Sequence, residues 1–264
     1  MAGASAEPAF DADDVRRQAV ASHDLDALAT AMVECRACPR LVAWREQVAI
    51  EKVARFRDET YWARPLPGFG DPEARILLVG LAPAAHGGNR TGRVFTGDAS
   101  GDFLWAALHA TGFANKSASR RVDDGLELSD VRVAAVVRCA PPLNRPTTDE
   151  RDRCLPWLAR EIELLPQVRV IVALGGFGWD GSLRALTALG IPVPRPRPRF
   201  GHGAEATVAP FQLLGTYHPS QQNTFTGRLT PPMLETILRR ARDLADRPVG
   251  EPSYERGPGP DQYT

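Results

Sequence analysis

The sequence predicts an α/β protein with three layers, in which helices cover both faces of a central four-stranded parallel sheet. Four short apolar runs, each bounded by turn residues, indicate buried strands, and segments with helical spacing lie between them. Strands that alternate with helices are typical of parallel sheets buried on both faces. The chain has 264 residues, 43% of them hydrophobic and 24% charged, which favours one large domain with its own core.

The segments before the first strand have different characters. Residues 1–20 are small, acidic and alanine-rich, so we expect a flexible leader there. Residues 25–50 show helical spacing that is broken at the segment CRACPR. A linker that ends in a turn-rich stretch then leads to the first strand, residues 75–80, with the sequence RILLVG.

The rest of the chain alternates between strand and helix signals. Further strands are expected at residues 131–137, 168–174 and 211–215. Helices are expected at residues 102–111, 149–165 (capped by Thr148 or Asp149), 179–189 and 232–245, the last with prolines in its first turn. Residues 247–264 are rich in proline and glycine and are predicted to be a disordered tail, which leaves one domain at residues 21–246.

Charge and hydropathy limit the possible environments and partners. The 32 basic and 32 acidic residues cancel, which does not suggest a nucleic-acid binder. Nearly all basic residues are arginines, which suit phosphate contacts but also arise in GC-rich genomes. No apolar run approaches the roughly 20 residues that span a bilayer, and the N-terminus does not resemble a secretory signal. We expect a cytoplasmic monomer with no membrane partner.

Four cysteines indicate a metal centre. Cys35 and Cys38 form a Cys-x-x-Cys pair, Cys139 follows the second predicted strand, and Cys154 lies in the first turn of a predicted helix. In a cytosolic protein such a set favours metal binding over disulfides. Structural zinc usually uses two short cysteine pairs, so one close pair with two dispersed cysteines fits a [4Fe–4S] cluster somewhat better. Zinc stays open as the alternative, and four unrelated buried thiols fit less well.

A long, glycine-rich loop follows the first strand and leads directly into a helix. It carries His86, Arg90, Arg93, Phe95 and Asp98. Its glycines match neither a phosphate-binding loop nor a dinucleotide fingerprint. The loop therefore predicts a ligand site of another kind on a rigid scaffold. From the residues alone, Asp98 is better explained as the cap of the following helix, and Phe95 can be ordinary core.

Two other strands end in polar segments. The segment CAPPLNRP after the second strand carries Asn144 and Arg145. Residues 217–229 follow the fourth strand and begin with Tyr217, His218 and Pro219. Ligands of parallel α/β sheets bind beyond the carboxyl ends of the strands, so these segments should share one edge with the loop that carries Asp98. The alternatives are that Asn144 orders a turn and that His218 is a structural histidine.

At these residues the chain resembles a known family. The stretches GLAPAAHGGNRTGRVFTGDASGDFLW, CAPPLNRP and HPSQQNTFTGRLT are similar to those of the type B (family 5) uracil-DNA glycosylases of bacteria and archaea. The resemblance runs from about Cys35 to the final helix. It implies a four-stranded parallel sheet, removal of uracil or other damaged bases such as hypoxanthine and xanthine from DNA, and a [4Fe–4S] cluster held by Cys35, Cys38, Cys139 and Cys154.

The resemblance also implies roles for individual residues. Asp98, Asn144 and His218 match positions implicated in activity, whereas Ala82 stands where many members of the wider superfamily have an Asp or Asn that positions water. Phe95 would stack on the flipped base, Asn144 would bind its edge, and Ala82 and His86 would line the pocket. His218 would donate a hydrogen bond to the uracil O2, and Asp98 would stabilise the sugar cation or orient water.

The DNA partner requires further contacts. Residues 221–228 would enter the duplex and hold the gap open. The expected DNA-contacting residues are Arg90, Arg93, Arg145, Gln221, Gln222, Asn223 and Arg228. Two rival functions stay open on sequence alone: a DNA-damage-binding module without catalysis, stabilised by a cluster or by zinc, and a glycosylase that acts mainly on another lesion.

Overall fold

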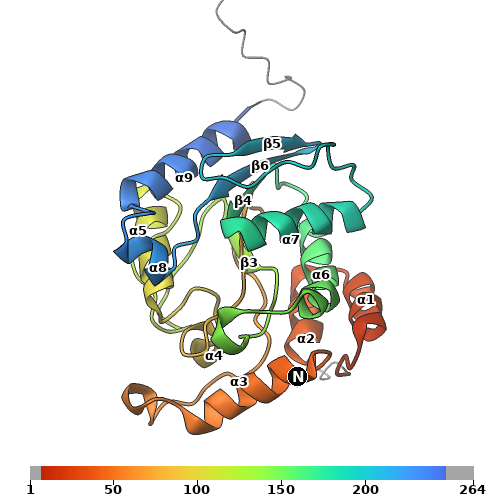
Figure 1. Ribbon diagram of the computed structural model, residues 1–264, viewed down its shortest axis with the longest axis vertical. Helices are drawn as coiled ribbons and strands as arrows, with labels where there is room; N and C mark the ends of the chain where they lie inside the picture. Colours follow the sequence, from red (N-terminus) through yellow and green to blue (C-terminus); the bar gives the residue numbers. More distant parts are fainter. Residues whose placement is uncertain (1–6, 248–264) are drawn as a thin grey trace, which may run out of the picture.

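The structure is a computed structural model that describes residues 7–247, and its centre is a six-stranded sheet with the strand order β1-β3-β2-β4-β6-β5 (Figure 1). The four inner strands are parallel, as predicted from their apolar sequences: β3 (Val131–Ala135), β2 (Ile76–Gly80), β4 (Val170–Leu174) and β6 (Phe211–Thr216). Leu78 of β2 fixes the central register, because it pairs with Val133 on one side and Val172 on the other. The predicted α/β fold is confirmed.

The two edge strands are not anticipated by the sequence. β1 (Phe69–Gly70) and β5 (Glu205–Val208) pair antiparallel with β3 and β6. β1 is too short to produce a periodic pattern. β5 is half exposed and therefore lacks the continuous apolar run that marks the inner strands.

Helices cover both faces of the sheet (Figure 1). One face packs against α5 (Ala99–Ala110) and α9 (Pro231–Ala245), with Trp105 and Leu238 in the core. The other face packs against α6 (Thr148–Glu163) and α7 (Gly175–Ala188), with Trp157 and Leu183 in the core. The strands serve both cores because successive side chains point to opposite faces.

The helix boundaries differ from the prediction where glycine or a cap decides them. α6 begins at Thr148, one residue before the predicted start, because Thr147 is its cap and forms a reciprocal capping box with Glu150. α7 begins at Gly175, since the segment GGFG, which contains three glycines, continues the helix instead of forming a loop. β3 ends at Ala135, two residues before the predicted end.

The expected flexible leader needs correction. Residues Ala12–Ala21 form helix α1, which is capped by Asp11 and buries Val15 and Ala19. Their spacing of four residues places both apolar side chains on one helical face, which packs toward α6. The acidic composition concealed this narrow apolar stripe. The helical segment after it divides at the CRACPR break into α2 (Leu25–Val33) and α3 (Pro39–Glu51), as the break suggests.

Short elements complete the connections: η1 (Ala54–Phe56), α4 (Gly88–Thr91), η2 (Pro142–Asn144) and α8 (Gln221–Phe225). Nearly all of the predicted disordered tail lies outside the described residues. Within the described part of the chain, the helices are too short or too polar to cross a bilayer.

Candidate functional site

One large cleft opens at the carboxyl ends of the parallel strands. The loop after β2, the η2 segment after β3 and the start of α8 after β6 all contribute to its lining. The cleft brings together most of the predicted site residues: Ala82, His86, Arg90, Phe95, Asp98, Asn144, Arg145, His218, Gln221 and Gln222. Because parallel strands place their carboxyl ends on one edge, loops far apart in sequence meet there.

Phe95 is held by several contacts in a strained backbone conformation. Its φ of 51° lies in the left-handed region, which a bulky residue rarely adopts. The indole Nε1 of Trp105 donates a hydrogen bond to the Phe95 carbonyl oxygen at 2.6 Å. A Cβ atom on Gly80 would lie 2.9 Å from the Phe95 Cζ, so the ring packs against the bare end of β2. Such strain, maintained by surrounding contacts, is typical of functional sites.

Asp98 has both of the roles that the sequence offered as alternatives, because it caps α5 and also lines the cleft. Its Oδ1 accepts a hydrogen bond from the Gly101 backbone N–H at 2.9 Å. Its Oδ2 lies so close to Gly87 that a Cβ atom there would be only 1.9 Å away. Burial raises the pKa of this carboxyl, against the opposing effect of backbone hydrogen bonds.

His218 lies beside Phe95, with 6.0 Å between the ring centroids. Gly175 leaves room for it, since a Cβ atom there would lie 3.1 Å from the His218 Cβ at a φ of 90°. Asn223 holds the backbone by donating from Nδ2 to the His218 carbonyl oxygen at 2.8 Å. Burial lowers the pKa of His218 from 6.5 to about 4, so the imidazole is neutral at physiological pH.

Asn144 lies in an exposed and strained turn. Leu143 and Asn144 both have a φ of 55°, and the Leu143 side chain is 83% exposed. The turn therefore presents an amide and an apolar side chain toward the cleft. Arg145 follows it and is exposed as well.

His86 is tied to a segment that precedes the sheet. The Tyr61 hydroxyl and the His86 Nδ1 are 3.0 Å apart, and the two rings meet edge to face. Burial, followed by the charges of Arg55 and Arg90, lowers the pKa of His86. His86 and Ala82 both line the cleft, which is consistent with the pocket-lining roles expected of them.

Two predicted phosphate-binding arginines need correction, because their guanidinium groups are buried and already bonded. Arg90 is 7% exposed, pairs with Glu59, and donates from Nε to the His86 carbonyl oxygen at 2.8 Å. Arg93 is 5% exposed and pairs with Asp124 at 2.6 Å. Neither side chain is available for phosphate, and both instead organise the loop that carries Phe95 and Asp98.

The segment expected to enter the duplex is largely exposed. Gln221 and Gln222 begin α8 and line the cleft, and Phe225 at its end is 79% exposed. Arg228 lies over the Tyr217 ring at 4.5 Å and is outside the cleft lining. Asn223 points its amide back to His218, so it supports the site from within.

Other cleft residues escaped the sequence prediction. Arg55 and Phe56 of η1, together with Glu59 and Thr60, line one side, and Arg120 and Arg121 line another. They lie in connecting segments with no periodic pattern, and only the arginine pair at 120–121 offered a signal.

The four cysteines surround one cavity. It contains about 340 Å³ of space free of protein atoms, some of it open to solvent, and its lining includes Cys35, Cys38, Cys139 and Cys154. Burial and then the neighbouring thiols raise the pKa of Cys38 to about 12. Among residues 7–247 there is no group of three or more His, Cys, Asp or Glu side chains that could hold a metal ion.

Buried arginines surround this cavity. Arg45 is 2% exposed, and its Nη1 donates to the Cys139 Sγ at 2.9 Å. The Arg138 backbone N–H lies 3.3 Å from the Cys154 Sγ, and its guanidinium pairs with Glu161. In the described part of the chain, Arg45 Nε and Arg138 Nε and Nη1 lack a hydrogen-bond acceptor. Unpaired buried donors and positive charge suit an anionic group with sulfur acceptors.

Comparisons with known proteins agree with this geometry. Residues 67–242 match the model of the Uracil DNA glycosylase superfamily. A type-5 uracil-DNA glycosylase of Mycobacterium tuberculosis is 56% identical over 213 residues, covering 80% of this chain and 78% of the relative. One from Thermus thermophilus is 52% identical over 223 residues, covering 84% of this chain and 99% of the relative. A type-4 enzyme of Pyrobaculum aerophilum is 35% identical over 164 residues, covering 61% and 74%.

Proposed function

The chain belongs to the uracil-DNA glycosylase superfamily, and from this membership we propose that it removes uracil from DNA by hydrolysing the N-glycosidic bond, as a step of DNA repair. One observation supports the chemistry above all others: Phe95, Asp98 and His218 line the same cleft at the carboxyl edge of the sheet. The relatives are named as enzymes, so a binding module without catalysis is not favoured.

The base pocket combines a stacking surface with polar groups. The target base must leave the stack to reach such a cleft. Phe95 stacks on the extruded base, and the Asn144 amide, which can both donate and accept, hydrogen-bonds its edge. Ala82 and His86 line the pocket beside them.

Two groups act on the charges that develop as the bond breaks. The leaving uracil becomes anionic, and neutral His218 stabilises it by donating an N–H to O2. The sugar becomes cationic, and the Asp98 carboxylate stabilises it or orients the attacking water. Ala82 offers no polar group for water at its position, which increases the demand on Asp98.

We propose that the four cysteines hold a [4Fe–4S] cluster. The four thiols line one cavity, and one close cysteine pair with two dispersed cysteines fits such a cluster better than a structural zinc site, which usually uses two short pairs. Arg45 and the Arg138 backbone donate to two of the sulfurs, as expected around an anionic cluster. Cys35, Cys38, Cys139 and Cys154 would hold the cluster, which would thereby link the α2–α3 connection, the segment after β3 and α6.

The direct test uses purified, anaerobically prepared protein and a duplex oligonucleotide with one uracil. Alkali cleaves the strand at the abasic site, and sizing of the strands reports base removal. We expect cleavage at uracil, at least 100-fold slower in Asp98→Asn and His218→Ala, and unchanged in the control Glu235→Gln on α9. An intact uracil strand from protein that contains its cluster would contradict the proposal. Release of hypoxanthine or xanthine from duplexes that carry these bases would then identify another lesion as the substrate. The monomeric state and the cytoplasmic location stay predictions.

A further inference from the structure

A loop outside the motifs forms one rim of the cleft. Residues 115–126 lie in the connection from α5 to β3, and Arg120, Arg121, Val122 and Asp123 of this loop line the cleft. The loop is exposed and has no regular secondary structure around these residues. Its backbone is nevertheless fixed by a dense set of polar contacts.

Asp124 is the centre of these contacts. One carboxylate oxygen, Oδ2, accepts hydrogen bonds from the backbone N–H groups of Arg120 at 2.8 Å and Arg121 at 3.2 Å. The other, Oδ1, accepts from the Leu126 N–H and from the Arg93 guanidinium. These bonds and the ion pair hold the pKa of Asp124 well below its usual range, although burial opposes them. The side chain thus fixes both ends of the loop tip.

Arg93 connects this loop to the proposed catalytic loop. Its guanidinium donates to the carbonyl oxygens of Arg121 at 2.6 Å and Val122 at 3.1 Å, and its Nε donates to the Thr96 hydroxyl at 3.1 Å. The Gly97 N–H also donates to the Ser119 carbonyl oxygen at 3.2 Å. Residues 119–124 are therefore fixed relative to residues 93–98, which include Phe95 and Asp98.

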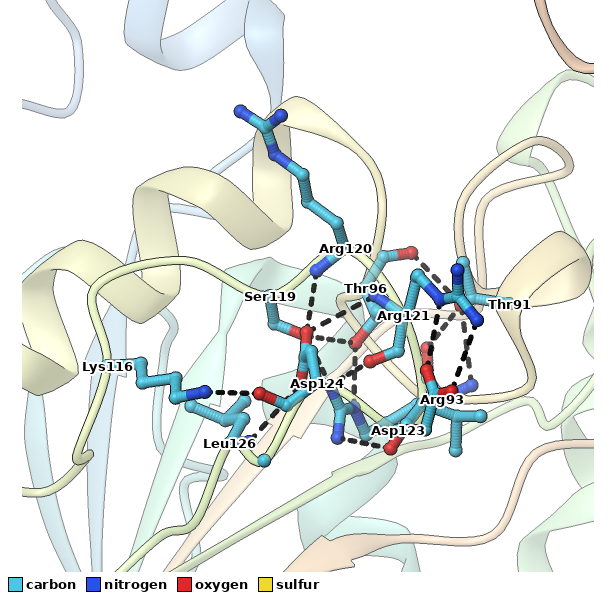
Figure 2. Close-up of polar contacts among 12 residues, drawn as sticks. Thr91, Arg93, Thr96, Lys116, Ser119, Arg120, Arg121, Asp123, Asp124 and Leu126 are labelled. Carbon is cyan, nitrogen blue, oxygen red and sulfur yellow. Dashed lines mark hydrogen bonds and ion pairs between the residues drawn. The ribbon is translucent and has the colours of Figure 1, made fainter.

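Within this loop, Arg120 is the arginine whose guanidinium these contacts leave available. Figure 2 shows its side chain directed away from the cluster, and within the described residues its guanidinium makes no hydrogen bond or ion pair. Its neighbour Arg121 is paired with Asp123 at 3.0 Å. Elsewhere along the cleft, Arg90 is paired with Glu59. Arg120 thus contributes an exposed and uncompensated charge on a rim whose backbone is fixed.

We infer that Arg120 binds a backbone phosphate of the DNA strand that enters the cleft, and that Asp124 and Arg93 are positioning residues for it. The inference rests on the proposed function. A guanidinium suits the oxygens of a phosphate, and phosphate contacts set the position of a protein on DNA. Because the loop is bonded to the segment with Phe95 and Asp98, a phosphate held at Arg120 places the target nucleotide relative to those two residues.

The salt dependence of DNA binding tests Arg120. Each phosphate contact contributes about 0.9 to the slope of log Kd against log salt for duplex DNA. We expect Arg120→Gln to lower that slope by about one and to weaken binding several-fold, equally for a uracil duplex and for an undamaged duplex, both measured in the slow-cleaving Asp98→Asn background. The control Arg239→Gln removes an arginine that is paired with Glu235 on α9, outside the cleft lining, and should leave the slope unchanged. An unchanged slope in Arg120→Gln would overturn the inference.

Asp124→Asn tests the positioning role, because electrostatics alone and positioning of Arg120 predict opposite changes in DNA affinity. Asp124→Asn removes a negative charge near the DNA, which by electrostatics alone would tighten binding. If the carboxylate positions Arg120, binding instead weakens and the salt slope falls as in Arg120→Gln. Tighter binding in folded Asp124→Asn protein, checked by its thermal midpoint, would refute the positioning role. Failure of the proposed function would be seen separately, as wild-type protein that binds DNA without releasing uracil.

Discussion

His218 offers the most specific prediction about the chemistry. Burial lowers its pKa from 6.5 to about 4, which corresponds to about 3 kcal/mol in favour of the neutral ring. At pH 7 about one ring in a thousand is then protonated, so the group can donate a hydrogen bond but cannot serve as an abundant acid. Single-turnover cleavage should therefore show no loss between pH 6 and 8 that depends on His218.

Substitutions separate donation from protonation. His218→Ala removes the donor and should slow single-turnover cleavage by about 10²–10³-fold. His218→Gln keeps an N–H group and should retain more activity, with a pH profile shaped like that of the wild type. A wild-type rate that falls with a midpoint near pH 6.5 as the pH rises, and loses this feature in His218→Gln, would refute the neutral-donor reasoning.

The same pKa predicts how stability changes with pH. Below pH 6.5 the unfolded chain takes up a proton at this histidine, whereas the folded protein does not until about pH 4. The contribution of this group is therefore fully present above pH 6.5 and is lost as the pH falls through that window. Chemical denaturation at pH 7 and pH 5 should show a smaller decrease in the free energy of unfolding for His218→Gln than for the wild type.

Other expected outcomes concern the carboxylates and α8. Because burial raises the pKa of Asp98 above its usual value, the cleavage rate should fall on the acid side as this carboxylate is protonated. Asp98→Asn should abolish this acid limb and slow cleavage by at least 100-fold without lowering the thermal midpoint. A preserved acid limb in that variant would contradict the assignment. Glu161→Gln breaks the buried pair with Arg138 and should destabilise the protein by about 3–5 kcal/mol. Exposed Glu163→Gln on the same helix should cost less than about 1 kcal/mol. Equal melting curves for the two variants would contradict this expectation. Phe225→Ala should weaken binding to a uracil duplex more than to a single strand, as measured by fluorescence anisotropy, if α8 enters the duplex.

Local sequence signals were sufficient for the inner architecture. Every residue of the apolar run ILLVG in β2 is buried. Such a continuous run is typical of strands in parallel sheets, because helices cover both faces. The same reasoning missed β5, because an edge strand is half exposed and its pattern is weak. It also missed α1, whose apolar stripe consists of a few residues such as Val15 and Ala19 in an acidic segment.

The predicted site residues are of two kinds. Phe95, Asp98 and His218 follow strand ends, so the topology of a parallel sheet is enough to bring them to one edge. The arginines required the tertiary structure, because sequence cannot show which guanidinium is already bonded. Arg93 lies in the motif and is buried against Asp124, whereas Arg120 lies outside it and is free of such partners within the described residues.

The sequence by itself thus determined the four inner strands, the cleft edge and the types of groups present there, since these depend on periodicity and on the order of strands. Only the tertiary structure decided which groups are charged, buried or available. The neutral state of His218 and the raised pKa of Asp98 come from burial, and burial depends on contacts between segments far apart in the chain.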